Sequence, residues 1–281
     1  MSILETICEE RRAEVAGLKR ERPSSSLVRS AAPPRRAFAP RAPEPGFPRG
    51  RPILIAECKR ASPSKGIMLT DYDPVALSGA YERGGASLVS VLTEPRHFLG
   101  SVSHLAFVRE AVDLPVLRKD FIVDPWQLRE AWSLGADAVL LIAACLEPTQ
   151  LSELAAAARE LGLSVLVETR RPPEITAALS ALPDAIGVNA RDLRDFSVSA
   201  SLPLAMLREL EVSAPPFLPR IAESGLRIGA DAVALRDAGY DGFLVGEALA
   251  TAADPEKATR AFVRSIGDSS RADHLVVGSA G

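Results

Sequence analysis

The stretch Gly135-Ala-Asp-Ala-Val-Leu-Leu-Ile142 decides the fold, because a glycine that can end a helix leads directly into a short apolar run. The same pattern recurs at Gly85-Ala-Ser87 and at Gly239-Tyr-Asp241, each time before further apolar residues. A short apolar run after a helix end indicates a buried strand. The chain therefore alternates helices with strands, as α/β proteins with a parallel sheet do.

Eight such units fit between residues 52 and 265. Strands are expected at 53–58, 88–92, 116–117, 138–142, 165–168, 185–188, 217–222 and 242–245, and helices at 74–83, 101–111, 125–134, 148–161, 173–181, 202–210, 227–238 and 255–264. Their number and spacing match an α/β fold of the (β/α)8 TIM barrel type, for which about 250 residues are typical. A doubly wound open sheet is the alternative, but no Gly-x-Gly-x-x-Gly follows the first strand.

Residues 1–51 differ from the remainder in charge and composition. They carry 11 basic and 6 acidic residues, whereas residues 52–281 carry 22 and 30. Apolar residues near helical spacing predict an amphipathic helix over 3–20. Seven prolines in 33–52 predict either a linker or an extended wrap over the body, and the opposite charges favour the wrap. We expect a helical arm with a Pro-rich wrap (1–51), a catalytic barrel (52–265) and a C-terminal tail without fixed structure (266–281).

Composition excludes several classes of protein. The net charge of −3 gives no reason to expect nucleic acid or an anionic membrane as a partner. No run of apolar residues is long enough to span a bilayer, and residues 1–12 do not resemble a secretory signal. Cys8, Cys58 and Cys145 are far apart in the sequence, fit neither a disulfide framework nor a zinc site, and suggest a reducing cytoplasm.

Polar residues at the strand ends are the candidates for chemistry, because the active sites of such barrels lie at the carboxyl ends of the strands. Side chains alternate along a strand, so Glu57 and Lys59 point together into the barrel mouth while Cys58 points outward. A buried ion pair is a poor device for stability, which favours a functional role for this pair.

The later strands end in further polar residues. Lys119 follows the third strand, Glu168 the fifth, and Asn189 and Arg191 share one face at the end of the sixth. The seventh and eighth strands end in Glu223-Ser224-Gly225 and Leu244-Val-Gly246-Glu247. Small residues after these two strands are typical of a phosphate site in this architecture.

Four segments together resemble indole-3-glycerol-phosphate synthase, the barrel enzyme that closes the indole ring in tryptophan biosynthesis. They are Lys59-Arg-Ala-Ser-Pro-Ser-Lys-Gly66, Leu117-Arg-Lys-Asp-Phe-Ile122, Ile186-Gly-Val-Asn-Ala-Arg-Asp-Leu193 and Ala222-Glu-Ser-Gly225. The resemblance runs from about residue 3 to about residue 265 and includes a helical arm that in this family covers the top of the barrel.

The resemblance implies a reaction and a role for each polar residue. In this family 1-(2-carboxyphenylamino)-1-deoxyribulose 5-phosphate condenses its aryl ring onto its ketone, then loses CO2 and water. Negative charge builds on the ketone oxygen, and by resemblance Lys119 is the acid that neutralises it. Glu168 is then the second acid/base group and Lys59 shares in proton transfer, while Glu57 orients Lys59 and Asn189 hydrogen-bonds substrate hydroxyls.

The remaining candidates hold the substrate. Arg191 is expected to bind the aryl carboxylate or to fix Glu57, and Phe98 and Phe121 to wall the aryl ring. The phosphate is expected to bind at Ser62, Ser224, Gly225, Gly246 and Glu247, chiefly through backbone N–H groups. Glu223 and Leu244 are further substrate-binding candidates. No step requires a metal, flavin or nicotinamide, so no cofactor is expected. The expected partner is a small phosphorylated substrate, and the enzyme is expected to be a monomer or a weak homodimer.

Two other functions remain open from the residues alone. A sugar-phosphate isomerase such as phosphoribosylanthranilate isomerase would use the same phosphate loops, but the two lysines with Glu168 and the N-terminal arm fit it poorly. A barrel kept only as a binding or complex-forming subunit would leave the charges at its mouth buried without a task, which is costly.

Overall fold

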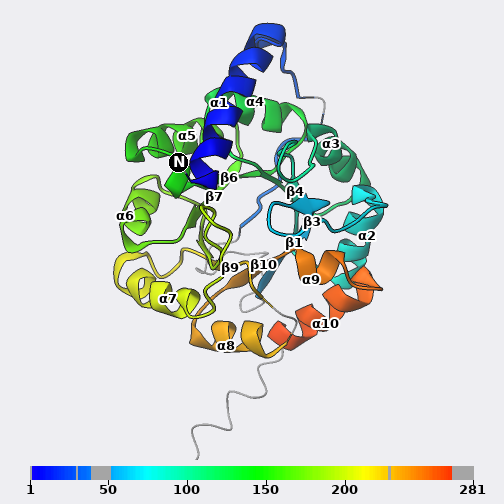
Figure 1. Ribbon diagram of the computed structural model, residues 1–281, viewed down its shortest axis with the longest axis vertical. Helices are drawn as coiled ribbons and strands as arrows, with labels where there is room; N and C mark the ends of the chain where they lie inside the picture. The colour runs from blue at the N-terminus through cyan, green and yellow to red at the C-terminus, as the bar shows by residue number, and fades with distance from the viewer. Residues whose placement is uncertain (1, 30, 39–51, 227–228, 268–281) are drawn as a thin grey trace, which may run out of the picture.

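The computed structural model describes residues 2–29, 31–38, 52–226 and 229–267, and its centre is a closed barrel of parallel strands (Figure 1). Neighbouring strands pair in the order β1-β10-β9-β8-β7-β6-β5-β4. The strands are β1 (Ile53–Cys58), β4 (Leu88–Leu92), β5 (Val116–Lys119), β6 (Ala138–Ile142), β7 (Ser164–Thr169), β8 (Ala185–Asn189), β9 (Arg220–Glu223) and β10 (Gly242–Val245). This arrangement confirms the predicted TIM barrel with an N-terminal helix.

Helices alternate with the strands and surround them (Figure 1). They are α2 (Pro74–Gly84), α3 (Val102–Ala111), α4 (Pro125–Ser133), α5 (Pro148–Glu160), α6 (Pro172–Ser180), α7 (Leu202–Ser213), α8 (Ala230–Ala238) and α10 (Pro255–Gly267). Proline begins several of them because its fixed φ suits the first turn, and the Asp73 and Asp124 side chains cap α2 and α4. None of the described helices is long and apolar enough to cross a membrane.

The seventh strand is the clearest error in the predicted boundaries. A strand over 217–222 is wrong, because β9 begins only at Arg220 and continues to Glu223. Pro219 has no N–H to donate to a strand ladder, although its carbonyl accepts from Ile186 N at 2.9 Å. Short elements were also missed: the hairpin of β2 (Ala61–Ser62) and β3 (Gly66–Ile67), the 3-10 helices η1 (Ser24–Ser26) and η2 (Ala143–Cys145), and α9 (Glu247–Ala250).

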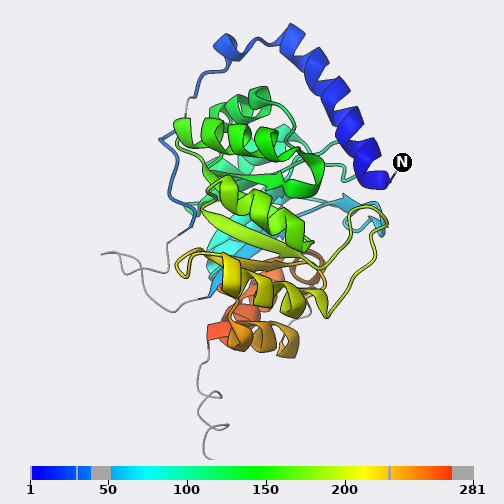
Figure 2. The ribbon, with the colours of Figure 1, turned by 90° about the vertical axis from the view of Figure 1, so that its left-hand side faces the viewer.

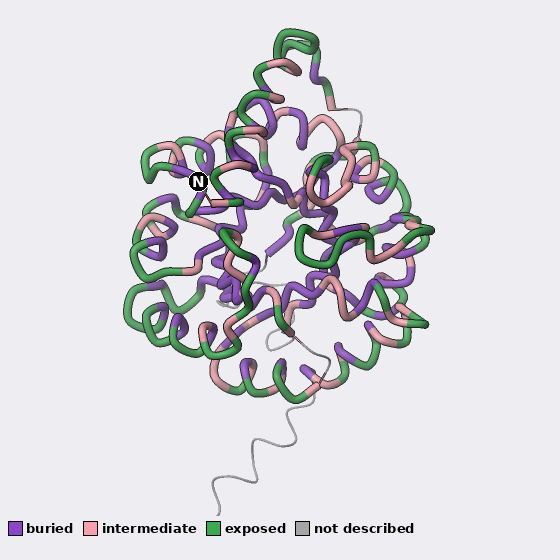
Figure 3. The backbone as a smooth tube through the Cα atoms, viewed as in Figure 1, coloured by how far each residue is buried: buried purple, intermediate pink, exposed green. Residues whose placement is uncertain are grey.

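Buried residues concentrate along the barrel strands and on the sides of the helices that face them (Figure 3). Every residue of β4, β6, β8, β9 and β10 is buried, and all of these strands except β9 read as nearly continuous apolar runs. Several buried carboxyl groups, those of Glu57, Glu168 and Glu223, lie near the carboxyl ends of the strands. Other buried charged residues, such as Asp137 before β6 and Arg220 at the start of β9, lie at the opposite end of the barrel.

The arm is an α-helix, α1 (Ile3–Glu21), that begins with a capping box between Ser2 and Glu5. It buries one face, formed by Leu4, Ile7, Cys8, Arg11 and Val15. Figure 2 shows the start of α1 at the same end of the barrel as the β2–β3 hairpin, and the chain then returns along the outside to the opposite end.

The start of the proline-rich segment packs on the barrel, as a wrap does. Arg35 N donates to Asp137 Oδ1 at 2.7 Å, and Ala37 and Phe38 join the core. Residues 39–51 of this segment, and residues 268–281 of the expected tail, lie outside the described residues. Residue 266, placed at the start of that tail by the sequence, is instead buried in α10.

Two cysteines that are remote in the sequence meet in the structure. The Sγ atoms of Cys8 in α1 and Cys145 in η2 lie 2.7 Å apart, and both residues are buried. Cys58 is buried separately, with its Sγ 3.8 Å from the carbonyl of Pro74. The sequence separation of 137 residues conceals the pairing of Cys8 with Cys145.

Candidate active site

A cavity of about 500 Å³ opens at the carboxyl ends of the strands. All the site residues predicted from the sequence line this cavity except Glu168: they are Glu57, Lys59, Ser62, Phe98, Lys119, Phe121, Asn189, Arg191, Glu223, Ser224, Gly225, Leu244, Gly246 and Glu247. Residues from six different strands or the loops after them thus meet around one space of the size that small-molecule sites have.

The Glu57 and Lys59 side chains form an ion pair at the end of β1. Lys59 Nζ lies 2.8 Å from Glu57 Oε1, as their alternation along the strand predicts. Burial by itself would raise the pKa of Glu57, but Lys59 and Lys119 more than offset it, so that pKa is lowered. Glu57 is therefore held as a carboxylate between two ammonium groups.

Lys119 lies at the end of β5 between two carboxylates. Its Nζ is 3.8 Å from Glu168 Oε2 and 3.9 Å from Glu57 Oε2, and its side chain is 17% exposed. Burial acts to lower the pKa of Lys119, yet the charges of Glu168, Glu57 and Glu223 raise it above its usual value. The site thus keeps a charged proton donor facing the cavity.

Glu168 lies beside the cavity rather than in its lining, in contact with a small pocket near Leu4 of α1. Asn189 connects it to the substrate cavity: Asn189 Nδ2 donates to Glu168 Oε1 at 2.9 Å, and Asn189 Oδ1 accepts from Arg191 N at 2.9 Å. Glu168 Oε2 is buried without a hydrogen-bond partner among the described residues. That oxygen is the one that faces Lys119.

Glu223 is a third carboxyl group in the same cluster. Both its oxygens are buried and have no hydrogen-bond partner in the described part of the chain. Burial and the neighbouring charge of Glu168 raise the pKa of Glu223 well above its usual value, although Lys119 opposes the shift. Gly187 makes room for it, because a Cβ at that position would collide with Glu223 Oε1. Glu223 therefore holds a proton more readily than Glu57 does.

The end of the cavity beside β9 and β10 has backbone exposed by small residues. Ser224 and Gly225 both adopt left-handed conformations, with φ of 64° and 68°. Gly246 lies against the ion pair of β1, and a Cβ there would come 2.5 Å from Glu57 Oε1. Lys65 adds a cation at this end, 3.4 Å from Glu247. Such a surface suits an anionic group.

Apolar side chains form another part of the lining. The rings of Phe98 and Phe121 have centroids 6.1 Å apart, and both face the cavity. Phe196 and Val198, from the loop after β8, were missed by sequence reasoning, since loop residues carry no periodic pattern. Arg191 supports this loop by donating to the carbonyl of Phe196 at 3.0 Å.

Within the described ranges no group of three or more His, Cys, Asp or Glu is arranged to hold a metal ion. The cluster at the barrel mouth instead places carboxyl groups and ammonium groups within reach of each other. This combination suits acid/base chemistry on a substrate that carries both an anionic end and a flat apolar part.

Comparisons with known proteins point to one family. The sequence profile of the family described as "Indole-3-glycerol phosphate synthase" matches residues 4–262. An indole-3-glycerol phosphate synthase of Chlorobium phaeovibrioides is 44% identical over 255 residues, covering 89% of this chain and 95% of that protein. An "Indole-3-glycerol phosphate synthase 2" of Streptomyces coelicolor is 48% identical, covering 80% of this chain and 84% of its own.

Similar solved structures support the fold alone. The 3-hexulose-6-phosphate synthase of Salmonella typhimurium superposes with a TM-score of 0.59 at 16% identity, covering 76% of this chain and 98% of that one. A structure described as native KDPGal gives a TM-score of 0.55 at 18% identity.

Proposed function

The chain belongs to the indole-3-glycerol phosphate synthase family, and we propose that it performs this family's ring closure with the residues gathered at the barrel mouth. It is a decarboxylating lyase of tryptophan biosynthesis that forms indole-3-glycerol phosphate. The observation that carries the assignment of residues is the position of Lys119 Nζ, within 4 Å of Glu57 and Glu168 at the cavity.

Lys119 is the acid for ring closure. When the aryl ring attacks the ketone, the ketone oxygen gains negative charge and must accept a proton. An ammonium group that lines the cavity both stabilises the charge and supplies the proton. Loss of CO2 from the ring carbon follows and needs no further proton donor.

Glu168 and Lys59 serve the dehydration that completes the indole. This step requires protonation of the new hydroxyl group and removal of a proton from the ring system. Glu168 faces Lys119 on one side of the site, whereas Lys59 is paired with Glu57 on another. Asn189 holds Glu168 through its amide and orients it toward the substrate hydroxyls.

The two ends of the substrate bind at opposite parts of the lining. The phosphate group binds at Ser62, Ser224, Gly225, Gly246 and Glu247, chiefly through backbone N–H groups, and Glu223 and Leu244 are further substrate-binding residues. Phe98 and Phe121 wall the aryl ring on one side, and its carboxylate interacts with Arg191. Arg191 also braces the loop that carries Phe196.

The domain division, the location and the partners of the enzyme follow from the same interpretation. The division into an arm and wrap (1–51), a barrel (52–265) and a tail (266–281) is part of this proposal, except that residues 266 and 267 belong to α10 of the barrel. So are a cytoplasmic location, action as a monomer or weak homodimer, and the lack of a nucleic-acid partner.

A fluorescence assay for indole-3-glycerol phosphate tests the function directly. Purified full-length protein is incubated with 1-(2-carboxyphenylamino)-1-deoxyribulose 5-phosphate without added metal or cofactor, and formation of the indole chromophore is followed. We expect turnover that saturates with substrate. No product from folded protein at any substrate concentration would rule the proposed function out.

A further inference from the structure

A buried arginine of the arm reaches the strand that carries the proposed acid. Arg11 is 4% exposed, although it lies on a helix at the surface of the barrel. Its Nε and Nη2 donate to the two carboxylate oxygens of Asp120 at 3.1 and 2.7 Å, and its Nη1 lies 2.8 Å from Glu14 Oε2. Two parallel bonds of this kind fix a carboxylate in both position and orientation.

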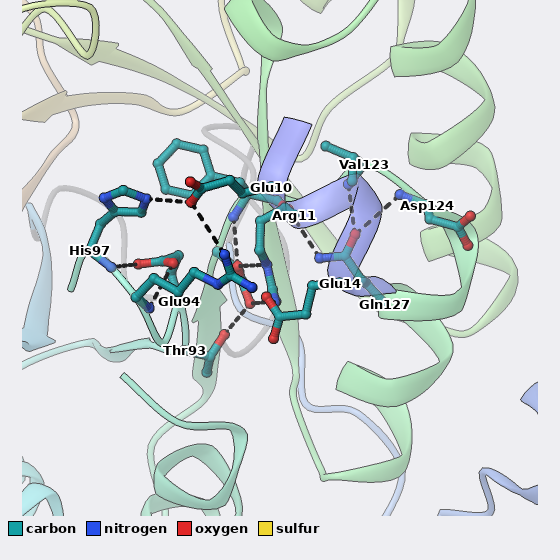
Figure 4. Close-up of polar contacts among 12 residues, drawn as sticks. Glu10, Arg11, Glu14, Thr93, Glu94, His97, Val123, Asp124 and Gln127 are labelled. Carbon is teal, nitrogen blue, oxygen red and sulfur yellow. Dashed lines mark hydrogen bonds and ion pairs between the residues drawn. The ribbon is translucent and has the colours of Figure 1, made fainter. Parts of the chain in front are cut away.

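Asp120 follows Lys119 directly and is 1% exposed. Besides Arg11, it accepts hydrogen bonds from Thr93 Oγ1 at 2.6 Å, from Arg118 Nη2 at 3.0 Å and from Phe121 N at 2.8 Å. Figure 4 shows Arg11 among Glu14, Thr93 and the loop of Glu94. The carboxylate therefore ties α1, β4 and the end of β5 together at one point.

This arrangement is better explained by positioning than by stability. A buried ion pair loses hydration on both partners and is weak evidence for stabilisation. The residues on both sides of Asp120 line the substrate cavity: Lys119 as the proposed acid and Phe121 as the proposed aryl wall. A displacement of about 1 Å at such a group can reduce a rate by about a hundredfold.

We propose that Arg11 is a positioning residue that acts through Asp120 to hold Lys119 in the site. The arm thus contributes to the geometry of the chemical step. This inference rests on the proposed function, because it assigns the chemical step to Lys119.

The test compares Arg11→Met and Arg11→Lys with Lys19→Met in the full chain. Lys19 makes an exposed ion pair from the same helix to Asp124 at 2.7 Å, so it is a matched control for docking of the arm. We expect Arg11→Met to lower kcat by about 10- to 100-fold while KM changes much less. Arg11→Lys should restore part of kcat, and Lys19→Met should stay within about twofold.

A double-variant cycle tests the route through Asp120. If Arg11 acts through this carboxylate, Arg11→Lys combined with Asp120→Asn should be no slower than the slower single variant. The cycle uses Arg11→Lys rather than Arg11→Met, so that a positive charge remains at position 11. A melting temperature above the assay temperature verifies that each variant is folded. If the losses in kcat of the two single variants multiply in the double variant, the proposal is overturned. It is also overturned if Arg11→Met changes KM alone, or if Lys19→Met loses as much kcat as Arg11→Met does.

The two proposals can fail separately. A wild-type protein that forms no product overturns the function and this inference together. An active wild type whose Arg11→Met variant keeps its kcat overturns only the role of Arg11.

A different observation supports a second inference, concerning Cys8 and Cys145. Their Sγ atoms lie 2.7 Å apart, on α1 and on η2 directly after β6, and the proposed mechanism uses neither. We infer that this pair is oxidised to a cystine by thiol–disulfide exchange with a small disulfide, which fastens the arm to the barrel.

The exchange balances without any other reactant. One protein thiolate attacks a sulfur of the small disulfide and releases one small thiol, leaving a mixed disulfide. The second protein thiolate then displaces the second small thiol and forms the Cys8–Cys145 bond. Two protein thiols are oxidised and one small disulfide is reduced to two thiols.

Thiol counting with oxidised glutathione as the probe tests this inference. After incubation, denaturation and alkylation, we expect the number of alkylated cysteines in the wild type to fall from three to one, with no glutathione attached. In the Cys58→Ser control the number of alkylated cysteines should fall from two to zero. The oxidised form of this variant should melt several degrees higher than its reduced form. Retention of all thiols, or a stable glutathione adduct on Cys8 or Cys145, would overturn the inference.

Discussion

Lys119 Nζ and Glu168 Oε2 lie 3.8 Å apart across the barrel mouth, and that carboxylate oxygen has no hydrogen-bond partner within the described residues. The pair is too far apart for a strong hydrogen bond but close enough for each charge to stabilise the other. A substrate hydroxyl or carbonyl oxygen that enters the cavity can therefore interact with Lys119 without first breaking a tight bond.

Glu168→Gln should impair turnover more than substrate binding. The amide keeps the shape of the side chain and the contact with Asn189, but it can neither accept nor donate the proton that dehydration needs. We expect kcat to fall by about 10²- to 10⁴-fold with little change in KM. Steady-state kinetics measure this, with the exposed Glu153→Gln on α5 as control; a change in KM alone would refute the acid/base role.

Lys119→Ala should abolish turnover and leave the fold intact. The side chain is at the cavity surface, so its removal disturbs little packing, but no other ammonium group takes its place beside Glu168. We expect a loss in kcat of about a thousandfold or more, with a melting curve close to that of the wild type. The exposed Lys257→Ala on α10 is the matched control. Near-normal product formation by Lys119→Ala would show that another group is the acid.

Gly246→Ala should disturb the Glu57–Lys59 pair from the end of the neighbouring strand β10. The new Cβ would lie 2.5 Å from Glu57 Oε1 and 3.0 Å from Lys59 Nζ, so the pair must move. We expect kcat/KM to fall by at least about tenfold, since small shifts of catalytic groups are costly. Gly267→Ala is the control, because a Cβ there meets no atom within 4 Å. Equal kinetics in the two variants would contradict the proposed geometry.

Glu223→Gln should stabilise the protein at neutral pH. The folded pKa of Glu223 is raised, so the folded state binds its proton more tightly than the unfolded chain does. The wild type therefore loses stability as pH rises above about 4.5, the ordinary value, until the folded pKa is passed. Glutamine avoids this loss.

We expect Glu223→Gln to be more stable than the wild type at pH 7 by about 1–3 kcal/mol, the usual cost of an unpaired buried polar group. The difference should shrink as pH falls to and below 4.5, because the group becomes protonated in the unfolded chain as well as in the folded state. Urea unfolding of both proteins at the two pH values measures it. A difference that is independent of pH would mean that Glu223 does not carry the raised pKa.

The fold could be predicted because strand and helix signals repeat along the chain. The bounds of β1, β4, β6 and β10 coincide with those predicted, since each is an apolar run with a clear break after it. Near β9 the apolar residues at 217 and 218 extended the predicted strand backward, although Pro219 prevents regular pairing there. The two-residue strands of the β2–β3 hairpin are too short to show an alternation.

The site could be predicted only in part. Alternation along β1 correctly predicts that Glu57 and Lys59 share a face, and a closed barrel brings the strand ends together. The contact of Arg11 with Asp120 could not be predicted, because no sequence pattern fixes where the arm lies on the barrel. Its one signal is an arginine four residues after Ile7 and four before Val15, on the apolar stripe of α1.

The link between Arg11 and Asp120 joins residues 109 positions apart. A ribosome that adds about 5–20 residues each second makes α1 several seconds before the carboxylate that will hold it. During that interval the helix exposes its apolar stripe and a cation to whatever else is nearby in the cell. α1 is thus synthesised well before the strand end that receives its arginine, so its final docking must wait until β5 has been made.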